Sequence, residues 1–183
     1  MAHGAMVYNF ELVLSDVDRG VYETLTFRVA QHPSESDAYM VARILAYGLE
    51  YEEGLEFGPG LSTADTPALA VNDLTGQLLA WIDIGTPAAD RLHRASKAAD
   101  RVAVYCHKPP APWLATLAGQ RVHQSERIAI YAFDPRFIQD LAEILARRNA
   151  WALSRVEGEL YIESDGQSHI GAVTQLPWPE RAP

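Results

Sequence analysis

PALAVNDLTGQLLAWIDIG, residues 67–85, contains two apolar runs separated by a short polar segment. The polar segment Asp73-Leu74-Thr75-Gly76 is typical of a tight turn, in which we expect the Asp73 carboxylate to accept hydrogen bonds. The pattern therefore predicts two antiparallel strands, residues 67–73 and 78–85. Pairing the two strands across the turn sets Ala68 opposite Asp83. We call these two strands the reference hairpin.

An N-terminal hairpin and a long helix are predicted before this segment. Apolar residues alternate within residues 8–14 and 25–29, with a turn-rich loop between them, which predicts a β-hairpin. Ser34 is a favoured N-cap for a helix that we expect to end at Gly54. The helix is apolar over most of its surface and is predicted to be central and buried. One polar stripe differs, formed by Glu35, Tyr39, Arg43, Tyr47 and Glu50.

Helices and strands alternate after the reference hairpin. A helix is predicted for residues 88–98, with Thr86 as its cap, and another for residues 135–148. Strands are predicted for residues 102–107, 127–133, 151–156, 160–163 and 168–173, the last three forming a meander. Together these elements are typical of an α+β fold with a mixed β-sheet flanked by helices.

The chain length fits a single domain over residues 1–183, and composition restricts the classes of function. We expect residues 1–5 to be a cloning remnant and residues 177–183 to be a loose tail. The net charge is −9 and lysine occurs only as Lys97 and Lys108, which disfavours tight nonspecific binding to DNA phosphates. The sequence lacks a membrane-spanning apolar run and a signal-peptide pattern. Its single cysteine, Cys106, fits a reducing compartment, so we expect a cytoplasmic protein.

Several segments resemble the YaeQ family in their order and spacing. They are His32-Pro33-Ser34-Glu35 followed by a helix with Arg43, Gly60-Leu61-Ser62, Asp73-Leu74-Thr75-Gly76, Trp81-Ile82-Asp83-Ile84-Gly85, and Arg91-Leu92 with Arg94-Ala95. The resemblance covers nearly the whole chain. It implies a variant of the PD-(D/E)XK core of restriction endonucleases and many DNA repair nucleases, here with an added N-terminal β-hairpin and a C-terminal β-meander.

The resemblance directs attention to three positions of the reference hairpin. Nucleases of that superfamily carry an aspartate on one strand and an acidic residue and a lysine on its partner; these groups hold Mg²⁺ and activate water. Here Ala68 takes the place of the aspartate, Asp83 that of the acidic residue and Gly85 that of the lysine. Asp83 is the first candidate catalytic residue and Mg²⁺ ligand, because a charge ending an apolar strand needs a partner or a metal. The alternative is that Asp83 caps the following helix near Thr86.

Asp65 and three cations lie near Asp83 in the sequence. Asp65 precedes Ala68 by three residues in a loop that can fold back, so it is a candidate catalytic residue and metal ligand in place of the missing aspartate. The alternative for Asp65 is a solvated loop residue. The cations on the following helix are candidate contacts to nucleic-acid phosphates, or alternatively an exposed basic helix face; they are Arg91, Arg94 and Lys97.

The polar stripe of the long helix supplies the remaining candidates. If the stripe lines the same cavity as Asp83, Glu35 is a further catalytic residue and Arg43 a further nucleic-acid contact. A buried Arg43 needs a carboxylate, so the structural alternative is an internal ion pair with Glu35, Glu50 or Asp83. The two roles are compatible with each other.

Two classes of function follow from these residues. The first is a Mg²⁺-dependent nuclease, or a nuclease-derived protein that binds nucleic acid. The second is a catalytically inactive nuclease-like scaffold that acts as a protein-interaction module through its acidic surface and the edge strands of its terminal meander. The nuclease hypothesis requires Asp83, the polar stripe and the arginine-bearing helix to converge on one cavity.

Overall fold

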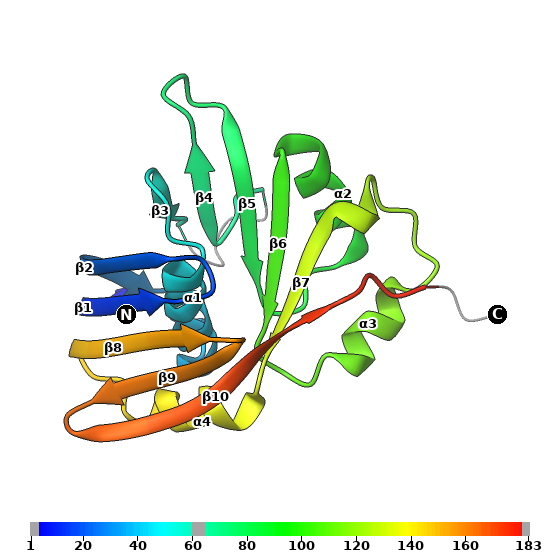
Figure 1. Ribbon diagram of the computed structural model, residues 1–183. Coiled ribbons are helices and arrows are strands. Elements are labelled where there is room, and N and C mark those ends of the chain that lie inside the picture. Colours follow the sequence, from blue (N-terminus) through cyan, green and yellow to red (C-terminus); the bar gives the residue numbers. More distant parts are fainter. Residues whose placement is uncertain (1–3, 60–64, 181–183) are drawn as a thin grey trace.

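The computed structural model describes residues 4–59 and 65–180, and its strands form one mixed sheet in the order β2-β1-β8-β9-β10-β7-β6-β5-β4-β3 (Figure 1). The strands are β1 (Met6–Asp16), β2 (Val21–Gln31), β3 (Leu55–Phe57), β4 (Leu69–Asn72), β5 (Leu78–Ile84), β6 (Arg101–Cys106), β7 (Ile128–Phe133), β8 (Arg148–Val156), β9 (Glu159–Ser164) and β10 (Gln167–Leu176). The helices are α1 (Asp37–Leu49), α2 (Ala89–Ala98), α3 (Ala111–Leu117) and α4 (Pro135–Glu143), with a 3₁₀ turn at Ser125–Arg127. The predicted α+β class with a mixed sheet is confirmed.

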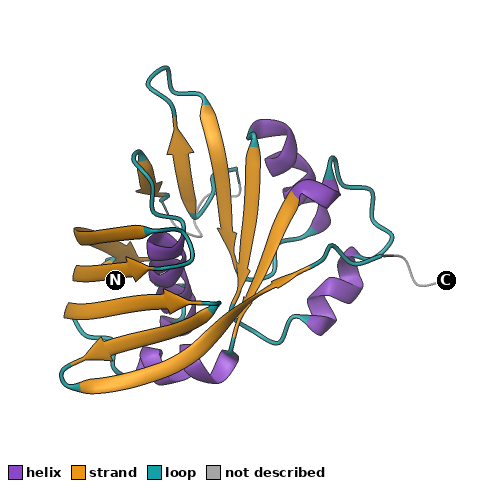
Figure 2. Cartoon of the chain, in the orientation of Figure 1, coloured by secondary structure: helices purple, strands orange, loops and turns teal. Residues whose placement is uncertain are grey.

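The sheet curls around α1 until it is nearly closed (Figure 1). Met40, Ile44 and Leu45 of α1 are completely buried in a core shared with apolar residues of β1, β5, β8 and β9. The prediction of a central buried helix is therefore confirmed. A second core, which includes Trp81 and Trp113, lies on the opposite face of β5, β6 and β7, where α2 and α3 pack (Figure 2).

The reference hairpin has the predicted register at its Asp83 end, but a bulge between Val71 and Asn72 pairs Asn72, rather than Asp73, with Leu78 near the turn. Leu69 pairs with Ile82, so the register continued by one residue sets Ala68 opposite Asp83. The Asp73 carboxylate accepts hydrogen bonds from the Thr75 hydroxyl at 2.7 Å, the Thr75 amide at 2.8 Å and the Gln77 amide at 2.9 Å. These bonds, that of the Thr75 hydroxyl first, lower the pKa of Asp73. The predicted turn role of Asp73 is confirmed.

The predicted boundaries of α1 were wrong at both ends. Ser36, not Ser34, is the N-cap, and its hydroxyl accepts from the Tyr39 amide at 3.1 Å. The Ser34 hydroxyl lies 2.6 Å from Nδ1 of His32 instead. The helix ends at Leu49 rather than near Gly54. Arg19 reaches this end from the β1–β2 turn and donates to the carbonyls of Gly48 and Tyr51, both at 3.1 Å.

The other differences arise from long-range pairing. α4 ends at Glu143, not at residue 148, because Arg148 begins β8, which pairs in parallel with β1 opposite Asn9. This parallel pairing joins the N-terminal hairpin to the C-terminal meander. Thr86 does not cap α2, whose N-cap is Ala88 without a side-chain hydrogen bond.

Two sequence predictions concern segments outside these elements. The expected loose tail, residues 177–183, follows directly after β10, which ends at Leu176, and Trp178 of this tail packs against the second core. The segment Gly60-Leu61-Ser62, like residues 1–3 and 181–183, lies outside the described residues. Within residues 4–59 and 65–180, the helices are all too short or too polar to cross a membrane.

Candidate functional site

Asp83 is held at the end of β5 by Arg91 of the following helix. Arg91 Nε donates to one carboxylate oxygen at 2.7 Å and a terminal nitrogen donates to the other at 2.8 Å. Asp83 is 2% exposed, and the guanidinium stacks over the Trp81 ring at 5.3 Å and donates to the Thr66 carbonyl at 2.8 Å. The hydrogen bonds to Asp83 raise the pKa of Arg91. Both oxygens of the carboxylate are thus engaged by a fork-shaped cation.

Glu35 and Arg43 form a second, more deeply buried pair. The two side chains are 0% and 1% exposed, and Arg43 donates to Glu35 at 3.1 Å. Arg43 also donates to the Ala30 carbonyl at the edge of β2 and lies over the Phe57 ring. Burial lowers the pKa of Arg43, and the charge of Glu35 opposes that shift. The predicted internal pair with Glu35 is therefore present, and the Arg43 guanidinium is buried; a contact of Arg43 with nucleic acid stays a prediction.

Tyr39 lies between the two ion pairs. The pKa of its hydroxyl is raised to about 12, chiefly by burial; the charges of Arg43 and Arg91 lower it, and those of Glu35 and Asp83 raise it. All four charges therefore act on one phenol. Asp83 and Glu35 are each bound by their own arginine, so the predicted convergence takes the form of two neutralised pairs on either side of Tyr39.

His107 and Gly85 complete this region, and sequence reasoning missed His107 as part of it. The His107 ring packs edge-on against Tyr39 at 5.9 Å between centroids, and burial lowers the pKa of His107 to about 4. Gly85 has a φ of 95°, where a side chain is strained. The backbone at position 85 thus favours glycine over the lysine that a nuclease-like pattern would require there. The signal for His107 was its place directly after an apolar strand.

Asp65 and the remaining cations lie on the surface. The Asp65 side chain is 82% exposed and contacts Arg94, itself 59% exposed, at 3.2 Å. Lys97 is exposed on α2. Arg91 is the one cation of this helix that joins Asp83, and the capping role of Asp83 is not present because α2 has no side-chain cap. Asp65 therefore pairs with Arg94 at the surface, whereas Asp83 pairs with Arg91.

The donor set does not fit Mg²⁺ in this arrangement. Mg²⁺ requires about six oxygen ligands in a regular octahedron, with carboxylates that are free to bind it. Both oxygens of Asp83 are bound by Arg91, and Asp65 contacts Arg94. Across residues 4–59 and 65–180, histidine, cysteine and acidic side chains do not gather in groups of three or more that could hold a metal ion.

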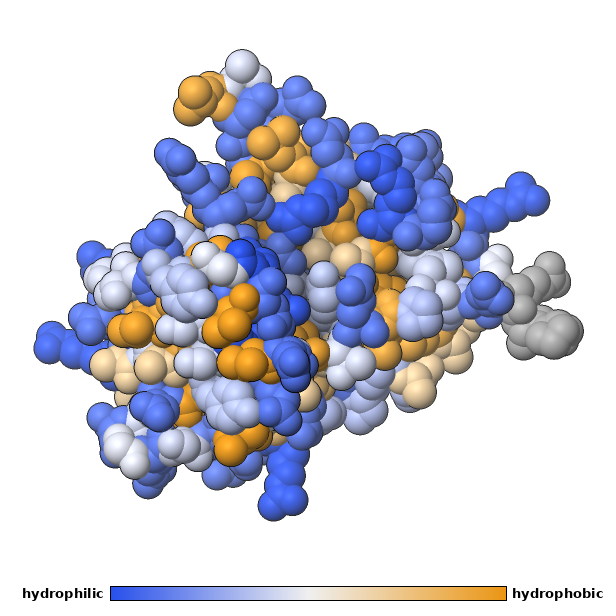
Figure 3. All heavy atoms as spheres, viewed as in Figure 1, coloured by the Kyte–Doolittle hydropathy of each residue, from blue (hydrophilic) through white to orange (hydrophobic). Residues whose placement is uncertain are grey.

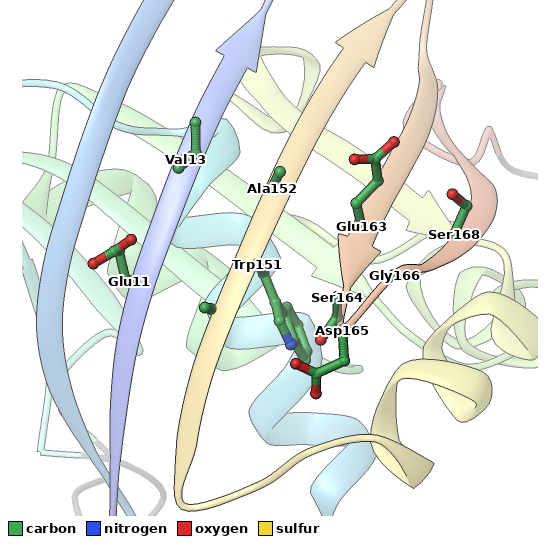
Figure 4. Close-up of a pocket in the computed structure, with 10 residues that line it drawn as sticks. Glu11, Val13, Trp151, Ala152, Glu163, Ser164, Asp165, Gly166 and Ser168 are labelled. Atoms are coloured by element: carbon green, nitrogen blue, oxygen red, sulfur yellow. The ribbon is translucent and has the colours of Figure 1, made fainter.

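A hollow of about 370 Å³ lies on the outer face of the curled sheet, away from Asp83 (Figure 4). α1 and α4 pack on the inner face of β1, β8 and β9, while the outer face is turned toward the viewer in Figures 1 and 3, where apolar patches lie among polar residues. Its floor includes the small residues Ala150 and Ala152, and its carboxylates are Glu11, Glu163 and Asp165. No local sequence pattern marks this hollow, because its residues come from strands far apart in the chain.

Comparisons with known proteins agree on one family. The sequence profile described as "YaeQ protein" matches residues 1–172. The uncharacterized protein YaeQ of Salmonella typhi is 28% identical over 172 residues, which cover 93% of this chain and 94% of that protein. The crystal structure of YaeQ protein from Pseudomonas syringae is similar with a TM-score of 0.86, at 33% identity, over 96% of this chain and 97% of that one. YaeQ protein from Xanthomonas axonopodis pv. citri gives a TM-score of 0.86 at 29% identity over 96% and 100% of the two chains.

Proposed function

We propose that this chain, which belongs to the YaeQ family, is a non-hydrolytic binding protein built on a variant of the nuclease-like core. The observation that carries the proposal is the Arg91–Asp83 pair, in which a guanidinium takes the place beside the carboxylate that a metal ion would need. Ala68 and Gly85 stand at the two other positions of the nuclease pattern. Without a metal ion to polarise a phosphate and a lysine to assist it, the core supplies a rigid support rather than a catalyst.

The hollow on the outer sheet face supplies the binding surface. Its small side chains leave the backbone of β8 accessible, and its three carboxylates make no hydrogen bond or ion pair with other described residues. Trp151 also borders the hollow, but its ring is buried in the core against Phe10, so the ring is not available to an occupant. Carboxylates without partners suit a polypeptide that carries basic side chains.

The occupant that this surface favours is a basic segment of a protein partner. The residues that line the hollow include Glu11, Glu163 and Asp165 and no lysine or arginine. The whole chain carries a net charge of −9, so long-range attraction also favours a cationic partner over a nucleic acid.

A charge-neutralised variant tests this function. A labelled peptide of alternating lysine and alanine should bind the wild-type chain, and Glu11→Gln/Glu163→Gln/Asp165→Asn should weaken binding by about tenfold in fluorescence anisotropy. The matched control is Glu53→Gln/Glu126→Gln/Asp140→Asn, which removes the same charges from exposed positions elsewhere. Equal affinities of the two variants would overturn the proposed surface.

Nucleic-acid binding through α2 is the second candidate. The observation that favours it is the exposure of Arg94 and Lys97 one helical turn apart, with Arg94 paired only to the exposed Asp65 among the described residues. Salt-sensitive binding of single-stranded or duplex DNA that disappears in Arg94→Ala/Lys97→Ala, but not in Arg121→Ala/Arg136→Ala, would favour this candidate. Mg²⁺-dependent cleavage that is lost in Asp83→Asn would overturn the non-hydrolytic proposal itself.

A further inference from the structure

A cavity of about 330 Å³ lies at the other end of α1 from Glu35. It is formed where the β1–β2 turn, the end of α1, β6, β7 and the end of β8 meet. Three arginines and two tyrosines contribute to its lining, which consists of Arg19, Leu49, Glu50, Glu52, Arg101, Tyr105, Tyr131 and Arg155. These residues come from five separate elements, which is why no sequence motif marks the cavity.

Carboxylates beneath and beside the arginines fix their positions. Asp16, which is completely buried, binds Arg19 at 2.7 Å and lies 3.7 Å from Arg155. Asp18 lies 3.0 Å from Nε of Arg155. Neither aspartate lines the cavity. The two arginines are therefore held from behind, and their fixed positions lower the entropic cost of binding a ligand.

Glu50 is neutralised within the wall. It is 7% exposed, and Arg101 and the Tyr105 hydroxyl both donate to it, the latter at 2.7 Å. Arg101 also donates to Glu52 at 2.8 Å. Glu50 and Glu52 in the lining, with Asp16 and Asp18 behind it, offset the charges of the three arginines, so the cavity offers hydrogen-bond donors rather than an excess of positive charge.

Two donors of the lining are not used by the protein. The guanidinium of Arg155 contacts Asp16 and Asp18 through one terminal nitrogen and Nε, and its other terminal nitrogen has no partner among the described residues. The Tyr131 ring stacks on Tyr105 at 4.8 Å, and its hydroxyl makes no hydrogen bond within the described chain. Burial raises the pKa of Tyr131, so the hydroxyl keeps its proton. Fixed, unused donors of this kind suit an oxygen-rich acceptor.

We propose that this cavity binds a small oxyanion, a phosphate or carboxylate group, through Arg155 and the Tyr131 hydroxyl, with Arg101 at its rim. The site is distinct from the Asp83–Arg91 pair and from the outer sheet face, and it does not depend on the function proposed for them. Phosphate and carboxylate groups share the acceptor geometry that a guanidinium recognises, so the structure specifies the group rather than the whole ligand.

Titrations with inorganic phosphate, pyrophosphate and succinate test the site. We expect saturable binding of at least one probe with a Kd of about 1 mM or tighter. The arginine Nε–H signals in NMR spectra report the binding. A preference for phosphate or for succinate identifies the source of the oxyanion, and either supports the proposal. Absence of saturation for all three probes, or saturation that leaves the Arg155 and Arg101 signals unmoved, overturns it.

Tyr131→Phe is the decisive variant because it removes only a hydroxyl and keeps the ring stacked on Tyr105. It should weaken binding by about fivefold, which corresponds to one hydrogen bond. Tyr161→Phe is the matched control, since it removes an exposed hydroxyl that bonds to Glu159 on β9. Equal weakening by both variants would show binding elsewhere and would overturn the proposal.

Discussion

At the scale of single residues, Arg91 determines what Asp83 can do. A carboxylate that is 2% exposed would be costly to bury alone, and the bidentate guanidinium offsets that cost. The pair therefore has a structural role that is independent of any chemistry. It also makes the carboxylate unavailable to a metal ion for as long as Arg91 remains in place.

Replacing Arg91 tests whether the buried Asp83 carboxylate depends on this guanidinium. We expect Arg91→Ala to lower the free energy of unfolding by about 2–3 kcal/mol, because it leaves the Asp83 charge buried without its partner. Urea denaturation measures the change, and Arg94→Ala is the control, since Arg94 contacts only the exposed Asp65 in the described chain. Equal stability of the two variants would show that Asp83 does not need the guanidinium. A stabilisation of Arg91→Ala by Mg²⁺, absent in the wild-type chain, would show that the arginine excludes the metal.

His107 makes stability depend on pH. Burial lowers its pKa from 6.5 to about 4, so the folded chain holds the ring neutral while the unfolded chain protonates it at higher pH. Protonation thus favours unfolding, and the stability that neutral His107 contributes is complete above pH 6.5 and lost as the pH falls toward 4.

The size of this effect can be measured by difference. Between pH 7.5 and pH 4.5 we expect the wild-type chain to lose about 2 kcal/mol more unfolding free energy than His107→Leu, which cannot protonate. His123→Gln removes an exposed histidine and should follow the wild-type profile. Parallel pH profiles for wild type and His107→Leu would contradict the burial of a neutral ring.

At the scale of elements, the start of α1 places the Glu35–Arg43 pair. The Ser36 hydroxyl satisfies the Tyr39 amide, and the chain before it turns so that Glu35 faces Arg43 rather than extending the helix. Sequence alone favoured Ser34 as the N-cap, although either serine satisfies the preference for a small hydroxyl before a helix. The Ser34 hydroxyl contacts the His32 ring at 2.6 Å, whereas the Ser36 hydroxyl accepts from the Tyr39 amide and caps the helix.

The two serines can be compared directly. Ser36→Ala should lower the free energy of unfolding by about 1 kcal/mol, as expected for the loss of an N-cap. Ser34→Ala should have a clearly smaller effect, since its hydroxyl lies at an exposed contact with His32. Thermal or urea denaturation of both variants gives the answer. A larger destabilisation by Ser34→Ala than by Ser36→Ala would show that Ser34 is the N-cap, as the sequence favoured.

At the scale of the whole molecule, the two ends of the chain close the fold. The parallel pairing of β1 with β8 covers α1 on one side. On the other side, β10 pairs with β9 along its first part and with β7 along its last part. This single strand therefore joins the part of the sheet formed by β1, β2, β8 and β9 to the part that carries α2 and α3. Beyond β10, Trp178 packs on the second core.

This arrangement predicts that the end of the chain contributes to stability. Trp178→Ala should lower the free energy of unfolding by about 1–2 kcal/mol, because a half-buried aromatic ring leaves the second core. Glu180→Ala, two residues later and exposed, should change little. Circular dichroism during urea denaturation measures both. A negligible effect of Trp178→Ala would support the loose tail that the sequence predicted.

Local patterns in the sequence determined the elements whose signals are local. Alternation and turn chemistry specified the reference hairpin and its register, and an almost uniformly apolar surface specified α1 as the central helix. The same patterns named Asp83 and Arg43 as charges that need partners, since a charge within an apolar element is costly wherever the chain folds. The family followed from motifs in order, which the comparisons confirmed.

Tertiary structure alone decided which charges meet. Arg91 and Asp83 lie on adjacent elements, but Arg101 of β6 binds Glu50 at the end of α1, which is 51 residues away in the sequence, and Arg155 meets Asp16 only because β8 pairs with β1. The end of α4 was likewise decided by that pairing, which outweighed the helical preference of residues 144–148. The physical reason is common to all of them: strand pairing and ion pairing join residues distant in the sequence, and their free energies are absent from any local window.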